Sequence, residues 1–315
     1  MNPVRTAVIG AGVQGQRHAE KFAALAESEL VAVCDVDVDR ASSLAAKLGA
    51  QAVQDYRDLI GQVAAVAVAI PASVHVDIAS TLLNSGVSVL LEKPIATTMD
   101  EARRLVEIAE AKPVVFQVGH LERFNPAAAA LATHMDEPLF IESHRIAPYM
   151  PRALDVSVVL DLMIHDIDLI HGLVRSPMGH VDAVGRSVFS DSIDVANARI
   201  RFTNGCVANV TASRISMKTE RTLRVFQADS YVSADLHGRT TTRYSKRGDG
   251  PVSGPDDVAI DKQSFGESDA LMDQAKAFLE SVAGGPAPLV SGRVAMEALE
   301  TAMVIGDLVG GQKKT

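Results

Sequence analysis

The chain has 315 residues, 47% of them hydrophobic and 22% charged, which predicts a globular protein long enough for two domains and excludes extensive disorder. Its net charge of −9, and the lack of a basic run with interleaved aromatic residues, disfavour nucleic acid as a partner. No apolar run is long enough to span a bilayer, and no signal peptide is recognised. The two cysteines, Cys34 and Cys206, show no metal-ligand spacing and indicate a reducing compartment. We therefore expect a cytoplasmic protein that binds neither nucleic acid nor membranes.

The first part of the chain alternates apolar runs with helical patterns. Strands are predicted at Val4–Ile9, Leu30–Cys34, Gln51–Val53, Val63–Ile70, Val87–Leu91 and Val114–Val118. Helical segments are predicted after the first strand through Ala26, over Val38–Leu48, at Tyr56–Ile60, from His75 onward and over Met99–Ala111. The strands are too apolar to alternate, as expected for parallel strands covered on both faces. The order predicts a doubly wound α/β sheet of about six strands.

A glycine-rich turn, Gly10–Gly15, joins the first strand to the first helix. Gly10 permits a tight turn, Gly12 lets backbone approach a pyrophosphate, and Gly15 allows close packing of helix on strand. Asp35 ends the second strand about 20 residues later, where a carboxylate binds the ribose hydroxyls of NAD and repels the 2′-phosphate of NADP. The alternative for Asp35 is an N-cap of the next helix, a role that Asp37 can also fill. The turn and Asp35 predict an NAD-binding Rossmann domain.

Other polar residues of this half follow predicted strands. Glu92-Lys93-Pro94 comes directly after Val87–Leu91, at the sheet edge where ligands bind in such folds. For Lys93 the alternative is a solvated surface lysine. His75 is equally consistent with a helix start and with a cofactor or substrate contact. His120 and Arg123 follow the last strand near the expected nicotinamide, although Arg123 is also consistent with a structural arginine at the domain junction.

The second half is predicted to be α+β, with several strands joined by turns and with helices along the chain between and after them. Helices are predicted at Asn125–Met135, Asp269–Val282 and Arg293–Val309, and strands at Pro138–Arg145, Val181–Phe189, Val195–Phe202, Cys206–Ala212, Arg221–Phe226 and Tyr231–Leu236. The stretch 239–266 is rich in Gly, Ser, Asp and Pro and predicts a loop or a hairpin. So broad a sheet can offer one face to substrate and the other to a second subunit, so we expect a homodimer or homotetramer.

The stretch Asp155–Val174 is predicted to be a helix that is apolar on most sides but carries acidic residues and a histidine. As a helix at about 100° per residue it places Asp161, His165 and Asp168 on one narrow stripe. Aspartates are rarely buried unpaired, so the stripe is expected to face a cavity, a ligand or a polar partner; the alternative is a capped, partly wet helix face. Five cationic residues of this half could bind a diphosphate, and the alternative is that they are scattered surface cations. They are Arg145, Arg152, Arg214, Lys218 and Arg221.

Four motifs in order carry a resemblance to a known family. They are Gly10–Gly15, Glu92-Lys93-Pro94, Gly119-His120 with Arg123-Phe124-Asn125-Pro126, and Asp161–Asp168. Together they resemble the Gfo/Idh/MocA family, the relatives of glucose-fructose oxidoreductase and inositol dehydrogenase. The resemblance implies a Rossmann domain over residues 1–121 and a substrate and oligomerisation domain over residues 122–315. The second is expected to be an α+β domain with a large open, mostly antiparallel sheet, whose C-terminal helix can pack back on the first domain. The reaction that it implies is hydride transfer between NAD(P) and a sugar or polyol carbon. The resemblance also implies that Lys93 and the Asp161–His165 pair are catalytic.

The sequence around these motifs points to one branch of the family. GHLERFNP, VVLDLMIHDID and ANARIRFTNGCVANVTASR are similar to a branch that oxidises C3 of UDP-N-acetylglucosamine to a 3-keto sugar nucleotide for an amino sugar of lipid A type. The chain departs from the family where glycines are common, having Ser157-Val158-Val159 before Asp161 and Ile164 before His165. Related members oxidise free sugars, inositol or UDP-linked uronic acids, which remain alternatives.

These expectations define a predicted site without a metal. The residues expected to bind NAD are Gly10, Gly12, Val13, Gln14, Gly15, Asp35, Pro71, His75, Glu92 and Lys93. The residues expected to bind substrate are Lys93, His120, Arg123, Asn125, Arg145, Asp161 and His165. His165 is the leading general base, Asp161 orients it, Lys93 bonds the reacting hydroxyl, and Asp168 has a supporting role.

Two readings from other classes remain open at this point. A non-catalytic NAD-binding sensor would keep the glycine turn and Asp35 but would not need Lys93, Asp161 and His165 together. A metal enzyme could use Asp161, His165 and Asp168 as ligands, because carboxylates and imidazole on one helix face suit a divalent ion.

Overall fold

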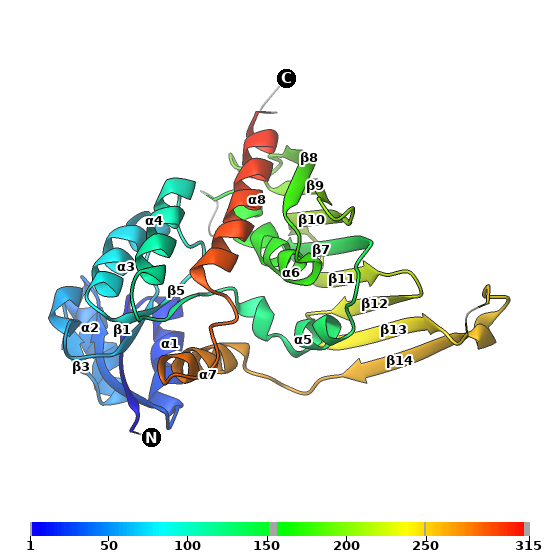
Figure 1. Ribbon diagram of the computed structural model, residues 1–315. Helices are drawn as coiled ribbons and strands as arrows, with labels where there is room; N and C mark the ends of the chain where they lie inside the picture. The colour runs from blue at the N-terminus through cyan, green and yellow to red at the C-terminus, as the bar shows by residue number, and fades with distance from the viewer. Residues whose placement is uncertain (1, 151–155, 249, 312–315) are drawn as a thin grey trace. The chain divides into compact units, whose positions relative to one another are not determined.

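The computed structural model describes residues 2–150, 156–248 and 250–311, and the chain divides into two compact units (Figure 1). The first unit contains Met1–Leu121 and Asp269–Met296, and the second contains Glu122–Ser268 and Glu297–Thr315. Residues 269–296 thus belong to the first unit, whereas the sequence prediction placed them in the second domain. The reason is local packing: Phe278 stacks on Phe22 with ring centroids 6.5 Å apart, and Lys21 Nζ lies 2.7 Å from Asp269.

The first unit is built on a six-stranded parallel sheet in the order β3-β2-β1-β4-β5-β6. The strands are β1 (Val4–Ile9), β2 (Ser28–Cys34), β3 (Gln51–Val53), β4 (Ala65–Val68), β5 (Ser88–Leu91) and β6 (Phe116–Val118). Strands β4, β5 and β6 are buried at every residue, which is why their sequences read as unbroken apolar runs. The chain turns from one half of the sheet to the other between β1 and β4, the switch point at which ligands bind in such folds. The predicted doubly wound sheet is confirmed.

Helices accompany these strands. They are α1 (Val13–Ala24), α2 (Val38–Leu48), α3 (His75–Asn84), α4 (Met99–Glu110) and α7 (Ala270–Val282), with 3-10 turns η1 (Tyr56–Leu59), η2 (Ala72–Val74) and η3 (Leu121–Phe124). Helices α2, α4 and α7 begin at side-chain caps. Helix α2 is capped by the Asp37 side chain and ends at Gly49, whose φ of 71° favours glycine. Helix α4 starts with a capping box between Thr98 and Glu101.

The second unit contains an eight-stranded, mostly antiparallel sheet in the order β14-β13-β12-β11-β7-β10-β9-β8. Its strands are β7 (Phe140–Pro148), β8 (Met178–Arg186), β9 (Val195–Phe202), β10 (Val207–Ser216), β11 (Glu220–Phe226), β12 (Ser230–Asp235), β13 (Thr240–Lys246) and β14 (Val258–Ser264). Strands β7 and β10 pair in parallel at its centre. Of the two predictions for residues 239–266, the hairpin is confirmed, with Thr240 opposite Ser264 and a 3-10 turn η5 (Pro255–Asp257) before β14.

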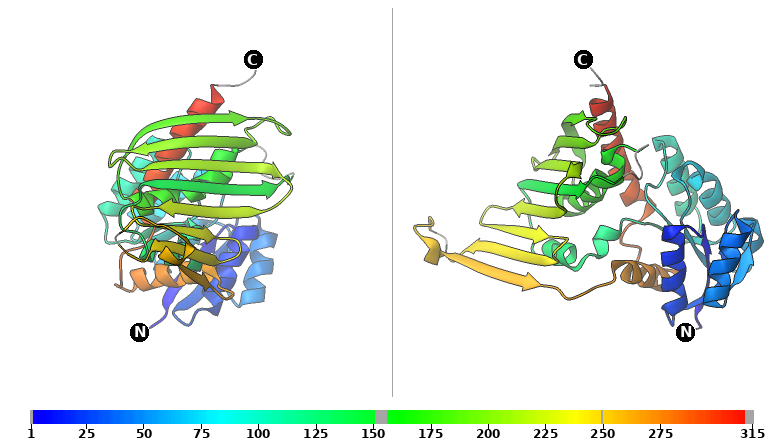
Figure 2. Two further views of the ribbon diagram at one scale, coloured as in Figure 1. Left: turned by 90° about the vertical axis from the view of Figure 1, so that its right-hand side faces the viewer. Right: turned by 180° about the vertical axis from the view of Figure 1, so that it is seen from behind.

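Among the described residues, helices cover one face of this sheet and none covers the other. Helix α5 (Pro126–Thr133), the π-helical turn η4 (Val159–Met163), α6 (Ile164–Val174) and the second-unit part of α8 (Gly292–Gly310) lie on one face, and the left view of Figure 2 shows the uncovered face. Side chains along β7 therefore alternate between the two faces of the sheet. Those that point to the helix-covered face, Ile141, Ser143 and Arg145, are at most 3% exposed. No helix among the described residues is long and apolar enough to cross a membrane.

Strand β8 ends at Arg186 rather than at the predicted Phe189. The backbone N–H groups of Val188, Phe189 and Ser190 bond to the Asp194 carboxylate instead of to a neighbouring strand. The helix predicted from Asp155 begins with the π-turn at Val159, and Asp155 itself lies outside the described residues.

Candidate active site

A cavity of about 670 Å³ lies at the carboxyl ends of β1, β2, β4 and β5 in the first unit. Eight of the residues predicted to bind NAD line it, namely Gly10, Gly12, Val13, Gln14, Asp35, Pro71, Glu92 and Lys93. Asp35 and Tyr56 line the part near β2, and Pro71 and Lys93 line the part near β4 and β5. The cavity therefore runs across the switch point, as an extended dinucleotide requires.

Each glycine of the turn has the surroundings that its predicted role requires. Gly10 has a φ of 93°, and a Cβ built there would lie 2.2 Å from the Ala69 carbonyl oxygen. A Cβ on Gly15 would lie 1.6 Å from the Gly10 carbonyl oxygen, whereas a Cβ on Gly12 would meet nothing within 4 Å. Gly12 is also the N-cap of α1 and has no side chain to cap it, so the first N–H groups of the helix are available to a pyrophosphate.

Asp35 is 9% exposed and is held by two backbone donors. Its Oδ2 accepts the Ala11 N–H at 2.6 Å and its Oδ1 accepts the Asp37 N–H at 2.9 Å. Asp37 caps α2 by accepting the Arg40 N–H at 3.1 Å, so the alternative role of Asp35 as that cap is wrong. Each carboxylate oxygen keeps a further acceptor site for a ribose hydroxyl.

Glu92 and Lys93 are half-buried at the end of β5. Glu92 Oε1 lies 2.8 Å from His18 Nε2, and Glu92 Oε2 accepts the Lys93 backbone N–H at 3.2 Å. Burial alone would raise the pKa of Glu92, but the His18 contact and the Lys93 N–H hold this pKa below its usual range. An ionised carboxylate therefore lies beside the residue expected to bond the substrate.

His75 does not line the cavity, in contrast to the prediction that it contacts the cofactor. It is 1% exposed, with Nδ1 2.9 Å from the Pro94 carbonyl oxygen and Nε2 3.0 Å from that of Ile70. Burial lowers the pKa of His75, although the two carbonyl contacts act in the opposite direction. The alternative reading, a side chain at a helix start, describes it: His75 ties the segment after β4 to the segment after Lys93. His120, at the end of β6, is likewise buried at 1%.

In the second unit, the three residues of the predicted stripe divide into two half-buried residues and one buried aspartate. Asp161 lies in the π-turn and His165 in the first turn of α6, and both are half-buried. Asp168 is fully buried, and Arg123 Nε lies 2.7 Å from its Oδ2 and Nη2 3.1 Å from its Oδ1. Asp168 thus faces a polar partner, one of the three surroundings expected for the stripe. Arg123 has the structural role that was the alternative for it, because its guanidinium is bonded to Asp168.

Arg145 was predicted to contact substrate but is 3% exposed and fully engaged. Its Nε and Nη2 bond the two Asp166 oxygens at 3.0 and 2.8 Å, and its Nη1 lies 2.8 Å from Glu122 Oε1. Asn125 caps α5 by accepting the Ala127 N–H, and its Nδ2 donates to the Leu236 carbonyl at 2.8 Å. The donors of both residues are therefore directed into the unit's own structure.

The remaining predicted cations mostly have internal partners as well. Arg214 Nε lies 2.9 Å from Asp194 Oδ1, and Arg214 Nη1 donates to the Val156 carbonyl at 2.8 Å. Burial opposes ionisation of Asp194, but hydrogen bonds from Ser190 and from three backbone N–H groups hold its pKa well below its usual range. Lys218 pairs with Glu220 and Arg221 with Glu122, while Arg152 lies outside the described residues.

Sequence reasoning missed His18, Glu122, Asp166 and Asp194. Asp166 adjoins the predicted stripe, and its burial is signalled only by the arginine on β7, 21 positions away. His18 lies one turn past the glycine motif, on the face of α1 that packs inward. Asp194 precedes β9 in a serine-rich turn, a setting that suggests an acceptor for backbone N–H groups.

The metal-enzyme reading is not supported by the donor set. Across residues 2–150, 156–248 and 250–311, no group of three His, Cys, Asp or Glu side chains is placed to hold a metal ion. Asp168, one of the three proposed ligands, uses both carboxylate oxygens on Arg123.

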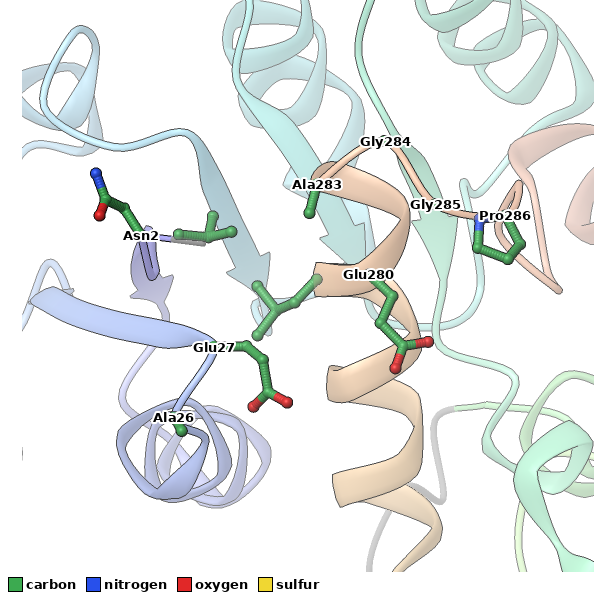
Figure 3. Close-up of a pocket in the computed structure, with 10 residues that line it drawn as sticks. Asn2, Ala26, Glu27, Glu280, Ala283, Gly284, Gly285 and Pro286 are labelled. Atoms are coloured by element: carbon green, nitrogen blue, oxygen red, sulfur yellow. The ribbon is translucent and has the colours of Figure 1, made fainter.

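A second cavity of the first unit, about 560 Å³, lies at the opposite edge of its sheet (Figure 3). It is bordered by Asn2 and Val4, by Ala26 and Glu27 before β2, and by residues 279–280 and 283–286 at the end of α7. This is the amino-terminal edge of the strands, where doubly wound folds do not bind their ligands.

The glycine cradle, Asp35 and the cavity across the switch point define a dinucleotide-binding Rossmann unit, here joined to a second unit with a broad, mostly antiparallel sheet. The chain belongs to the Gfo/Idh/MocA family of oxidoreductases. The family's NAD-binding Rossmann-fold model matches residues 4–120, and the model of its C-terminal domain matches residues 131–232. The protein is therefore an NAD-binding oxidoreductase.

Known proteins similar to this chain include a UDP-N-acetylglucosamine 3-dehydrogenase from Acidithiobacillus ferrooxidans, 37% identical over 281 residues and 89% of each chain. The solved structure of that enzyme covers 99% of both chains with a TM-score of 0.92 and 35% identity. An inositol 2-dehydrogenase from Rubrobacter xylanophilus is 34% identical over 175 residues, which are 52% of this chain and 50% of that protein.

Proposed function

We propose that this protein oxidises a sugar nucleotide, C3 of UDP-N-acetylglucosamine, to the 3-keto product with NAD as acceptor. The observation that carries the proposal is the similarity to the Acidithiobacillus enzyme over nearly the whole of both chains, at 37% identity and a TM-score of 0.92. The inositol dehydrogenase aligns with only about half of this chain, which favours the sugar nucleotide over a free polyol.

The chemistry assigns one task to each of three residues. NAD, when bound in the cavity of the first unit, supplies the acceptor for the hydride that leaves the sugar carbon. The His165 imidazole accepts the hydroxyl proton, since its ordinary pKa suits a general base near neutral pH. Asp161, one helical turn earlier, orients the ring and stabilises its charged form. The Lys93 ammonium hydrogen-bonds the same oxygen and stabilises the developing alkoxide.

The substrate is tested by NADH absorbance with UDP-N-acetylglucosamine, a UDP-linked uronic acid, free N-acetylglucosamine and myo-inositol. The proposal expects the largest kcat/KM with UDP-N-acetylglucosamine. A signal with free polyols alone would overturn it. NAD binding without turnover on a wider panel of sugars would instead support the non-catalytic sensor.

The catalytic roles are tested by Lys93→Ala and His165→Ala. Each is expected to lower kcat by about 10²–10⁴-fold. The Kd for NAD should change far less than kcat, even in Lys93→Ala at the edge of the cavity, because the glycine turn and Asp35 stay in place. Matched controls are Lys112→Ala and His180→Ala at exposed positions, where turnover should stay normal. Near-normal turnover in both active-site variants would remove these assignments.

We further propose that the chain forms a homodimer or homotetramer through the uncovered face of its eight-stranded sheet. An apolar row crosses six strands there, each member opposite the next: Ile260, Tyr244, Tyr231, Phe226, Phe140 and Val207. Neighbouring rings lie 4.5–5.7 Å apart, and Ile260 at one end is 57% exposed. Such a row suits burial against a second copy.

Light scattering tests this interface. The unmodified protein is expected to be oligomeric at micromolar concentration, and Tyr231→Lys with Ile260→Lys should yield monomers with unchanged secondary structure. A monomeric mass for the unmodified protein would contradict the proposal.

A further inference from the structure

A buried histidine holds the Glu92 carboxylate in one position beside Lys93. His18 of α1 is 2% exposed, and its Nε2 lies 2.8 Å from Glu92 Oε1. Glu92 Oε2 accepts the Lys93 N–H at 3.2 Å. Gly119, after β6, packs so closely that a Cβ built there would lie 3.1 Å from Oε2 and 3.3 Å from the Glu92 Cα. The carboxylate is therefore fixed from three sides.

The surroundings of His18 define which of its ring nitrogens donates to Glu92. The ring nitrogen on the far side, Nδ1, is buried and has no hydrogen-bond partner among the described residues. A proton on Nδ1 would therefore lie away from water without an acceptor, which is costly. Nε2–H accordingly donates to Glu92, and this contact together with the Lys93 N–H favours the ionised carboxylate, which supplies a negative charge.

The position of this charge along the cavity follows from the fold. Asp35 at the end of β2 marks the adenosine ribose, and the glycine turn after β1 marks the diphosphate. The remaining part of the cavity, lined by Pro71, Glu92 and Lys93, is left for the nicotinamide. This is the part of the cofactor whose charge changes in the reaction: the ring is cationic in NAD⁺ and neutral in NADH.

We propose that the His18–Glu92 pair makes the site prefer the oxidised cofactor, with Glu92 supplying the charge and His18 acting as its positioning residue. A fixed negative charge attracts the cationic ring and has no corresponding attraction for the neutral one. The pair therefore strengthens binding of the cofactor that must enter and adds nothing to the retention of the one that must leave. The proposal rests on NAD binding and not on the identity of the sugar.

The test measures the Kd of NAD⁺ and of NADH separately, without any sugar, by calorimetry and by NADH fluorescence. Glu92→Gln keeps the shape and removes the charge. It is expected to raise the ratio Kd(NAD⁺)/Kd(NADH) about tenfold, the size expected for one unit charge within roughly 10 Å at an effective dielectric near 20. Glu27→Gln removes an exposed carboxylate at the opposite edge of the sheet and should leave the ratio unchanged. An unchanged ratio in Glu92→Gln would overturn the proposal.

The role of His18 is tested by combining variants. His18→Asn is expected to raise the ratio in the same direction, because Glu92 loses the donor that holds it ionised and in place. In the Glu92→Gln background the same change should leave the ratio as it was, since His18 acts through Glu92. An equal effect of His18→Asn in both backgrounds would refute the positioning role. His18→Gln, whose longer side chain can return an N–H donor, should restore the ratio toward its original value, and its failure to do so while folded would count against the hydrogen bond.

Because no sugar is present, a negative result for the sugar panel leaves this experiment unaffected. Conversely, an unchanged cofactor ratio leaves the proposed substrate standing.

Discussion

The guanidinium of Arg123 occupies the space that a side chain at Gly172 would need. A Cβ built on Gly172 would lie 1.8 Å from Arg123 Nη1 and 2.4 Å from its Cζ. Arg123 cannot move aside and keep its partner, because its Nε lies 2.7 Å from Asp168 Oδ2 and its Nη2 lies 2.6 Å from the Asp168 carbonyl oxygen. We predict that Gly172→Ala destabilises the second unit by about 2–4 kcal/mol: separating a buried ion pair costs roughly 3–5 kcal/mol, and alanine's higher helix propensity returns up to about 1.

Gly306 in α8 is the matched control, since a Cβ built there meets nothing within 4 Å. Gly306→Ala should raise stability by about 0.5–1 kcal/mol, so the two glycine replacements are expected to have opposite signs. Urea unfolding followed by circular dichroism measures the free energy of unfolding of both variants. Faster amide hydrogen exchange in α6 of Gly172→Ala would show that the loss of stability is located in that helix. In an Arg123→Ala background the cost of Gly172→Ala should vanish. The reasoning is refuted if Gly172→Ala is as stable as the unmodified protein, or if its cost persists without Arg123.

Three further predictions follow from other parts of the structure. Asp35→Ser should raise the KM for NAD at least tenfold and narrow the preference over NADP, because a charged acceptor worth roughly 1.5–3 kcal/mol is lost; initial rates with both cofactors measure this. Burial lowers the pKa of His171 to about 4, so the unfolded chain binds a proton between pH 6.5 and 4 that the folded chain excludes. Stability should therefore fall by about 3 kcal/mol as pH drops through that window, and urea unfolding of His171→Gln should lack this loss. Asp194→Asn removes the charge that accepts from Val188, Phe189 and Ser190, and should destabilise the second unit by about 2–4 kcal/mol in the same assay; an unchanged midpoint would contradict the role assigned to that carboxylate.

The first unit was predictable from sequence because its signals are local. Continuous apolar strands, a glycine turn and an acid about 20 residues later each reflect a constraint within a few residues of chain. The structure adds the reason for each glycine, such as the carbonyl of Ala69 against Gly10. The alternative roles of Asp35 and Asp37 could not be separated from sequence, since both can cap a helix, and only the hydrogen bonds distinguish them.

The second unit was less predictable because its polar residues are satisfied by distant partners. Asp168 pairs with an arginine 45 positions away, and the helical projection identifies which residues share a face but not which side chain comes to meet them. A uniform 100° per residue also cannot represent the π-turn over Val159–Met163, which changes the register of Asp161 relative to the rest of the helix. Predicting Arg145 as a ligand for diphosphate failed for the same reason: its partners, Asp166 and Glu122, come from other elements.

These two ion pairs explain how an almost entirely apolar helix can present a defined polar edge. Apolar packing alone leaves the rotation of α6 weakly specified, because most directions around it are hydrophobic. Arg145 on β7 holds Asp166, and Arg123 on η3 holds Asp168, so two acids are anchored at fixed points of the unit. Rotating the helix would leave both charges buried without partners, at a cost of several kcal/mol each. Val158, Val159 and Ile164, which stand where the family commonly has glycine, are fully buried in the core and reinforce that rotation. Asp161 and His165 are half-buried on the same helical segment, and they are the polar residues of the stripe that remain accessible for the proposed proton transfer.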